Sequence, residues 1–120
     1  NGFSGFYISN AGFAYGNLSK LNGQHGYEAG QDVVLHDNVA DSNTGNGFYS
    51  SFNGGKLENN NSSDNAIGYE ITGADWLIIK NTASGNLVNA FSIAGSNKLA
   101  TIITVANLNT NTNPYANISF

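Results

Sequence analysis

The stretch GYEAGQDVVLHDNVADSNTGNGFY, residues 26–49, contains one full period of a repeat. It begins and ends with a glycine followed by an aromatic residue, and the two glycines are at positions 26 and 47. The same distance separates successive steps of this kind along the chain, except that the last distance is longer by one residue. The last step has alanine in place of glycine. The five steps are Gly5-Phe6, Gly26-Tyr27, Gly47-Phe48, Gly68-Tyr69 and Ala90-Phe91. Five steps in one phase indicate a repeat protein.

Two columns of polar residues keep a similar phase, each with two equal intervals followed by one that is longer by one residue. The first column is Asn17, Asn38, Asn59 and Asn81, and the second is Asn22, Asn43, Asp64 and Asn86. Asparagine tolerates the left-handed backbone conformation of a sharp turn. Stacked asparagine amides can also hydrogen-bond from one coil to the next. The columns therefore predict asparagine ladders at the turns.

A period of about 21–22 residues fits two solenoids, the leucine-rich repeat and the parallel β-helix. The chain lacks leucines at fixed offsets, so we predict an all-β fold, a parallel β-helix solenoid of about five coils. In such a solenoid the aromatic residues stack in a single file about 4.8 Å apart. Alternation along the strand then places two further columns. Ile8, Ala29, Ser50, Ile71 and Ile93 face inward, and Tyr7, Glu28, Tyr49, Glu70 and Ser92 face outward.

The individual strands are not equally clear. Residues 32–38, DVVLHDN, and residues 75–81, DWLIIKN, clearly predict strands. The matching residues 52–60, FNGGKLENN, are a weaker strand pattern and predict a bulge in the third coil. Residues 98–108 predict one longer apolar strand. We therefore assign residues 1–95 to the coils and residues 96–120 to a terminal coil and an extended capping tail. No cap is visible at the other end, where the chain begins in mid-pattern, and we expect a preceding segment.

Composition excludes several classes of function. Only 10% of the residues are charged, against roughly 25% in ordinary globular chains, and arginine is absent. The net charge of −4 and the lack of a basic patch argue against nucleic acid as a partner. No apolar run is long enough to span a membrane, and no cysteine is present for disulfides or metal ligation. Low charge with much Asn, Gly and Thr favours an extracellular protein, secreted or at the cell surface.

Residues 5–49, GFYISNAGFAYGNLSKLNGQHGYEAGQDVVLHDNVADSNTGNGFY, resemble the right-handed parallel β-helix repeats of pectate-lyase-like bacterial proteins. They are most similar to the β-helix module of secreted mannuronan epimerases, whose turns resemble DNVADSN at residues 37–43. That family has an Arg-His pair before the Gly-aromatic step, and here the pair is Gln24-His25. The family's Tyr-Asp-Pro-His motif is absent. The resemblance implies a right-handed coil and a polysaccharide ligand, with a uronate-type polymer as one candidate.

The candidate site follows from the outward column. His25 is the candidate catalytic residue, as a general acid or base. The candidate substrate-binding residues are Gln24, Tyr7, Glu28, Tyr49 and Glu70. Glu28 and Glu70 lie two coils apart, about 9.6 Å, close to the carboxylate separation of inverting glycosidases. Tyr7 and Tyr49 are placed to stack on sugar rings. The alternative is that outward residues of a solenoid only need to be polar, and that His25 is one rung of a mixed column.

Three functions remain open. The first is a segment of a secreted carbohydrate-active or polysaccharide-binding protein that is not catalytic by itself. The second is a self-assembling structural, adhesin or fibre module that stacks end to end through unpaired strands. The third is a uronate epimerase or lyase that uses His25. No cofactor and no transition-metal site is predicted. Calcium binding is an alternative to turn capping for Asp32, Asp37, Asp41 and Asp64.

Overall fold

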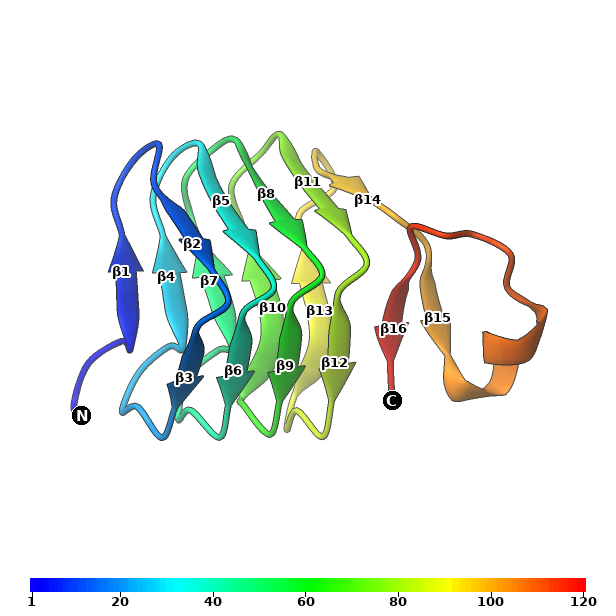
Figure 1. Ribbon diagram of the computed structural model, residues 1–120, viewed down its shortest axis with the longest axis horizontal. Coiled ribbons are helices and arrows are strands. Elements are labelled where there is room, and N and C mark those ends of the chain that lie inside the picture. The colour runs from blue at the N-terminus through cyan, green and yellow to red at the C-terminus, as the bar shows by residue number, and fades with distance from the viewer.

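The computed structural model describes residues 1–120 and shows a parallel β-solenoid of about four complete turns, 41 × 26 × 24 Å in extent. The coils stack along the long axis, and the two ends of the solenoid are at opposite ends of the molecule (Figure 1). Each complete coil contains three short strands, so equivalent strands form three parallel sheets. The predicted all-β solenoid is confirmed.

The three sheets run the length of the solenoid. Sheet A contains β1 (Phe6–Ile8), β4 (Tyr27–Ala29), β7 (Phe48–Ser50), β10 (Ile67–Ile71) and β13 (Asn89–Ile93). Sheet B contains β2 (Phe13–Tyr15), β5 (Val33–His36), β8 (Gly55–Glu58), β11 (Trp76–Ile79) and β14 (Lys98–Leu99). Sheet C contains β3 (Leu18–Lys20), β6 (Val39–Asp41), β9 (Asn61–Ser63), β12 (Thr82–Ser84), β16 (Asn117–Ser119) and β15 (Ile102–Thr104).

The aromatic file inside sheet A is confirmed. Neighbouring rings have centroids 4.8–5.0 Å apart and lie within 8° of parallel. The file consists of Phe6, Tyr27, Phe48, Tyr69 and Phe91. The spacing is that of neighbouring strands, so the ring stack follows from the backbone register. The two tyrosines also donate their hydroxyls to the carbonyls of Asn17 and Asn60, which satisfies the only polar side-chain atoms of the file.

The asparagine ladders exist, but two assignments from the sequence were wrong by one residue. The ladders are Asn17–Asn38–Asn60–Asn81–Asn117 and Asn22–Asn43–Asn65–Asn86. Asn59 and Asp64 instead precede ladder residues and have positive φ, 57° and 54°. The left-handed residue turns the chain, and the next residue then points its amide inward. The sequence predicts that one asparagine both forms the turn and joins the ladder, but in the structure two neighbouring residues divide these roles.

Each ladder contact is directional. The Asn60 Oδ1 accepts hydrogen bonds from the backbone N–H (2.9 Å) and the Nδ2 (3.3 Å) of Asn38 in the preceding coil. The Asn60 Nδ2 donates to the Leu35 carbonyl (2.8 Å) and to the Oδ1 of Asn81 (3.1 Å). Asn60 is 1% exposed, and all of its side-chain hydrogen-bonding atoms are used. Such a fully satisfied buried amide stabilises one register only.

The offset arises from an insertion and a compensating deletion. Strand pairing joins Phe13 to Val34 but Val33 to Gly55, so the third coil has one extra residue before β8. Gly54 and Gly55, with φ of 74° and 137°, accommodate it where the bulge was predicted. The turn between the ladder and the aromatic file is one residue shorter after Asn65 than in the other coils. The aromatic file therefore keeps its interval although the ladders shift.

Close packing explains the glycine of each Gly-aromatic step. A Cβ on Gly26 would lie 2.7 Å from the carbonyl oxygen of Gly47, and a Cβ on Gly47 would lie 2.7 Å from that of Gly68. Both distances are shorter than a normal contact between carbon and oxygen. Ala90 ends this column because no strand of sheet A follows β13. Alanine is thus tolerated in the last step because no following strand of sheet A approaches its Cβ.

The predicted single strand at residues 98–108 was wrong. The chain forms β14, crosses to sheet C as β15, and continues as a six-residue 3₁₀ helix, η1 (Val105–Thr110). A single strand cannot serve both sheets because the chain must turn a corner at residues 100–101. The later strand β16 then lies between β12 and β15 (Figure 1), and its Asn117 continues the first ladder. No helix of this structure is long and apolar enough to cross a membrane.

The two ends of the solenoid are alike in sheet A and differ in sheet C. In sheet A, Phe6 and Ile8 at the first end pack on the core but stay partly exposed, and so do Phe91 and Ile93 at the other end. In sheet C, however, β15 extends one strand beyond the level that β13 reaches in sheet A. A second molecule stacked flush on β13 would therefore meet β15 in sheet C.

The three consecutive asparagines 59–61 test the ladder assignment. We expect Asn60→Ala to lower the free energy of unfolding by about 2–4 kcal/mol because it leaves the buried Asn38 N–H and Leu35 carbonyl short of a partner. Asn61→Ala is the matched control, since Asn61 is exposed and its side chain only accepts a hydrogen bond from Thr82. Its effect should stay within about 0.5 kcal/mol. Urea unfolding followed by circular dichroism measures both, and equal effects would contradict the assignment.

A second prediction concerns the close approach of glycine. Gly47→Ala should destabilise the protein by about 1–3 kcal/mol, because the added methyl overlaps Ser62 Oγ and the Gly68 carbonyl. Gly95→Ala adds the same methyl where no atom lies within 4 Å. That control should leave the melting temperature unchanged or slightly raised. Thermal denaturation of the two variants gives the comparison, and a Gly47→Ala protein as stable as the control would contradict this account.

Candidate functional site

The outward column of sheet A is continuous. Strand pairing places Tyr7 beside Glu28, Glu28 beside Tyr49, and Tyr49 beside Glu70. Neighbouring strands lie about 4.8 Å apart, so these four side chains form one row along the solenoid. Tyr7 is 65% exposed, and the other three are partly buried by their neighbours. We call this row, with the residues that contact it, the sheet A face.

A second column contacts this row diagonally. Ser4 Oγ donates to Glu28 Oε2 (3.0 Å), and Asn46 Nδ2 donates to Glu70 Oε2 (2.6 Å). Between them, the His25 ring stacks on Tyr49, with centroids 4.5 Å apart and planes within 14°. Each contact joins a residue of one coil to an outward residue of the next. The three contacts have the same offset along the chain, and two are hydrogen bonds while the third is a ring stack.

Ser4 and Asn46 were not predicted as parts of the site. Their column, Ser4, His25, Asn46, Ile67 and Asn89, is mixed in chemical type, so the sequence predicts no shared role for its members. In the structure the first three members each have a partner in the next coil. The signal in the sequence was the pairing of two columns at a fixed offset, a serine or asparagine with glutamate and a histidine with tyrosine.

His25 is held in one orientation. Its Nδ1 accepts a hydrogen bond from the backbone N–H of Asn46 at 3.0 Å, so the neutral ring carries its proton on Nε2. Partial burial lowers the pKa of His25, and the carboxylates of Glu28 and Glu70 offset this only in part. The neutral ring can donate a hydrogen bond from Nε2. The ring is less suited to abstract a proton with Nε2. For that, the proton would have to be on Nδ1, where it would face the backbone N–H of Asn46.

Gln24 and His36 lie apart from this arrangement. Gln24 is exposed in the turn before β4, and its side chain makes no hydrogen bond within the protein. His36 belongs to sheet B, where it stacks on Tyr15 (5.5 Å between centroids) and lies 3.0 Å from Asp37 and 3.6 Å from Glu58. The two histidines are therefore on different sheets and cannot share a substrate or a metal ion.

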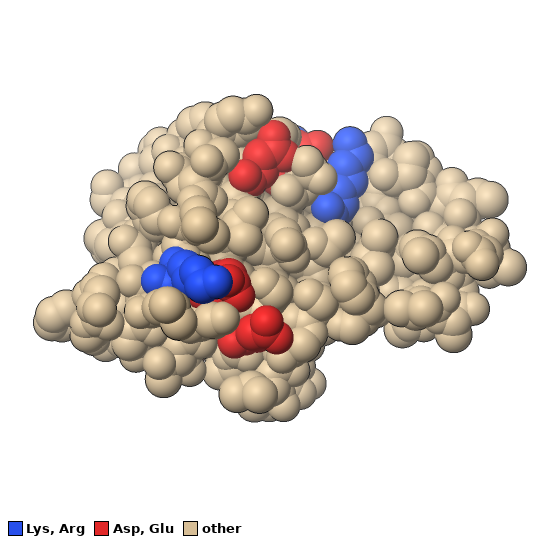
Figure 2. Space-filling model, turned by 60° about the horizontal axis from the view of Figure 1, so that its bottom comes forward, with Lys and Arg blue, Asp and Glu red and all other residues tan.

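The lysines are absent from the sheet A face. Lys20 is on sheet C, where it pairs with Asp41 at 2.6 Å, and its hydrogen bond lowers the pKa of that carboxyl. The other lysines, Lys56, Lys80 and Lys98, are on sheet B or directly follow it. Figure 2 shows one side of the molecule, on which the few charged side chains lie mostly beside one of opposite sign within a largely uncharged surface. With His25 neutral, Glu28 and Glu70 give the sheet A face a negative charge.

The acidic residues considered for calcium are dispersed. Asp32, Asp37 and Asp64 have positive φ and form turns, and Asp41 is occupied by Lys20. No group of three or more His, Cys, Asp or Glu side chains is placed to hold a metal ion.

Comparison with known proteins gives no relative. No family model matches the chain, and neither the curated proteins nor the solved structures give a significant match. The parallel β-solenoid is therefore known from the structure itself.

The environment of His25 predicts a pH effect on stability. Because its folded pKa is lowered, the unfolded chain binds a proton more readily below about pH 6.5, so stability is present above that pH and falls as pH falls. Between pH 7 and 5 we expect a loss of less than about 1 kcal/mol, since the ring is partly exposed. His25→Asn, the residue at position 46 of the same column, should abolish this loss, and His36→Asn should retain it. Urea titrations at pH 7, 6 and 5 compare the variants; an unchanged slope in His25→Asn would contradict the assignment.

Proposed function

We propose that the sheet A face binds an extended, neutral polysaccharide, and that the chain is a binding module of a secreted or cell-surface protein. The observation that carries this proposal is the row of Tyr7, Glu28, Tyr49 and Glu70, in which diagonal contacts hold the last three side chains in place. Aromatic rings pack on the apolar faces of sugar rings. Carboxylate oxygens and the His25 Nε2–H supply an acceptor and donor set for hydroxyl groups.

Preorganisation supports the proposal. Ser4 holds Glu28, Asn46 holds Glu70, and His25 holds Tyr49, so little side-chain entropy is lost on binding. The contacts repeat at the strand spacing along one line. A linear polymer that lies along the solenoid axis would meet them in succession, and several weak contacts on one chain add to useful avidity.

The charge of the face favours a neutral polymer over a polyuronate. Glu28 and Glu70 would repel the carboxylates of a uronate chain, and no lysine or arginine lies on the sheet A face to neutralise them. Epimerisation and β-elimination of uronates both need such a cation beside a base. The resemblance to mannuronan epimerases thus supports a polysaccharide-binding β-helix, and it does not extend to the epimerisation of uronates.

Isothermal titration calorimetry with soluble polysaccharides tests the proposal. We expect binding to a neutral glucan or mannan and none to alginate or pectate at low salt. Tyr49→Ala should weaken binding about tenfold, which corresponds to the loss of one aromatic contact.

Tyr15→Ala is the control, because Tyr15, like Tyr49, stacks on a histidine, but it lies on sheet B and is more exposed than Tyr49. It should bind as the unmodified protein does. Binding to alginate in preference to the neutral polymers, or equal losses in both tyrosine variants, would overturn the proposal.

A further inference from the structure

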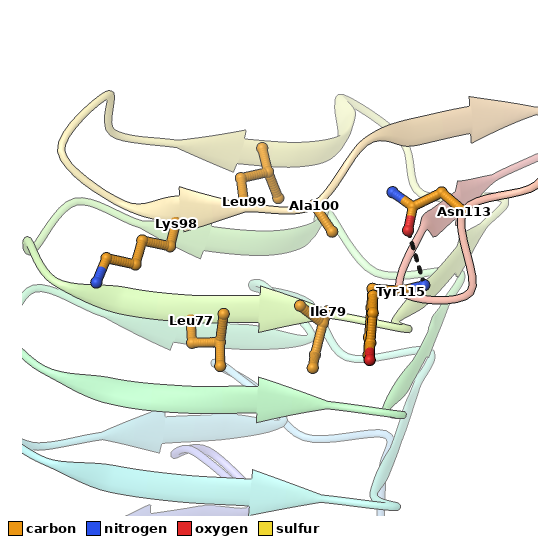
Figure 3. A pocket seen from close by; sticks show the side chains of 7 residues that line it. All are labelled: Leu77, Ile79, Lys98, Leu99, Ala100, Asn113 and Tyr115. Atoms are coloured by element: carbon orange, nitrogen blue, oxygen red, sulfur yellow. Dashed lines mark hydrogen bonds between the residues drawn. The ribbon is translucent and has the colours of Figure 1, made fainter.

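An open cavity of about 430 Å³ lies on the outer side of sheet B, and none of the residues that line it belongs to the row on sheet A. Its floor consists of Leu77 and Ile79 from β11, with Leu99 from β14 beside them. Tyr115 of the C-terminal segment forms one wall (Figure 3). The volume is within the range of small-molecule sites, about 300–1,000 Å³.

The tyrosine wall is fixed by the fold. The Tyr115 carbonyl accepts a hydrogen bond from the Lys80 N–H (3.0 Å), and the Tyr115 N–H donates to Asn113 Oδ1 (3.0 Å). Two residues later, Asn117 is buried in the first asparagine ladder. The Lys80 ammonium lies 5.5 Å from the centre of the Tyr115 ring, although Lys80 does not line the cavity. The position of Tyr115 is therefore set by contacts within the protein.

The opposite side of the cavity carries a free positive charge. Lys98 is the one lysine of the chain without an ion pair, since Lys20, Lys56 and Lys80 each have a carboxylate partner. No Asp or Glu lines the cavity. In Figure 3, Leu77 and Ile79 lie in a row between Lys98 and Tyr115. An apolar floor thus has a cation at one end and an aromatic ring at the other.

We propose that this cavity binds a small amphiphilic carboxylate, with an aromatic group against Ile79 and Tyr115 and the carboxylate at Lys98. Leu77 and Ile79 are two residues apart on one strand, about 7 Å, so a linker of a few methylene groups joins the two parts of the ligand. The apolar part gains from burial, and the unpaired ammonium selects an anion over a neutral analogue. This site is independent of the polysaccharide proposed for sheet A.

A matched set of three probes tests the proposal by NMR titration of backbone amides. Phenylbutyrate has both parts, phenylbutanol lacks the charge, and butyrate lacks the ring. We expect phenylbutyrate to shift the amides of residues 77–80, 98–101 and 115, phenylbutanol to bind about three- to fivefold more weakly, and butyrate not to bind. That ratio is the effect of one exposed ion pair.

Lys98→Gln should reduce the affinity for phenylbutyrate to that for phenylbutanol, whereas Lys20→Gln, on sheet C, should leave both unchanged. Tyr49→Ala should also leave both unchanged, which separates this site from the sheet A face. Equal binding of phenylbutyrate and phenylbutanol, an unchanged affinity in Lys98→Gln, or shifts that lie elsewhere would overturn the proposal.

Discussion

The hydrogen bond from one asparagine to its equivalent in the next coil is the constraint on which the structure depends. A ladder amide accepts from both the backbone N–H and the Nδ2 of the preceding coil, so it is satisfied only when the coils are in register. The ladder asparagines lie beside the apolar core, and each buried amide without a partner would cost about 1–3 kcal/mol. The register that satisfies the asparagines also aligns the aromatic file on one side and the outward row of sheet A on the other.

The sequence predicted the solenoid because periodicity is a property of the whole chain and survives local exceptions. The aromatic file is predicted residue for residue, since an insertion before β8 and a deletion after Asn65 cancel between successive rings. The same pair of changes displaced the ladders, and the run of asparagines 59–61 gave no compositional sign of which one is buried. The position of β16 could not be predicted either. Its Asn117 lies outside any period from Asn81, and only the tertiary fold brings the two together.

The candidate site was predictable in part for a similar reason. Alternation along a strand identified the outward row, and pairing along the sheet then required its members to be adjacent. The diagonal contacts of Ser4, His25 and Asn46 depend on side-chain direction across two coils, which alternation does not give. The orientation of His25 depends on one backbone N–H, and that bond changes its role from a candidate base to a donor.

Charge distinguishes the two outer faces that carry the proposals. Sheet A presents two glutamates without a cation, and sheet B or its border carries three of the four lysines. Glu58 pairs with Lys56 and Lys80 on sheet B, so Lys98 is the lysine there whose charge no carboxylate opposes. The two faces can therefore select chemically different ligands on a scaffold that is otherwise uniform along its length.

The placement of β16 between β12 and β15 separates the order of assembly from the order of synthesis. The first four coils can form one after another as the polypeptide emerges, each using the previous one as its template. The fifth level of sheet C cannot, because its occupant is made after the strand that lies outside it. Until residues 117–119 arrive, β15 has no neighbour in sheet C and Asn81 has no acceptor for its N–H. This end of sheet C can therefore be completed only after residues 117–119 are available to lie between β12 and β15.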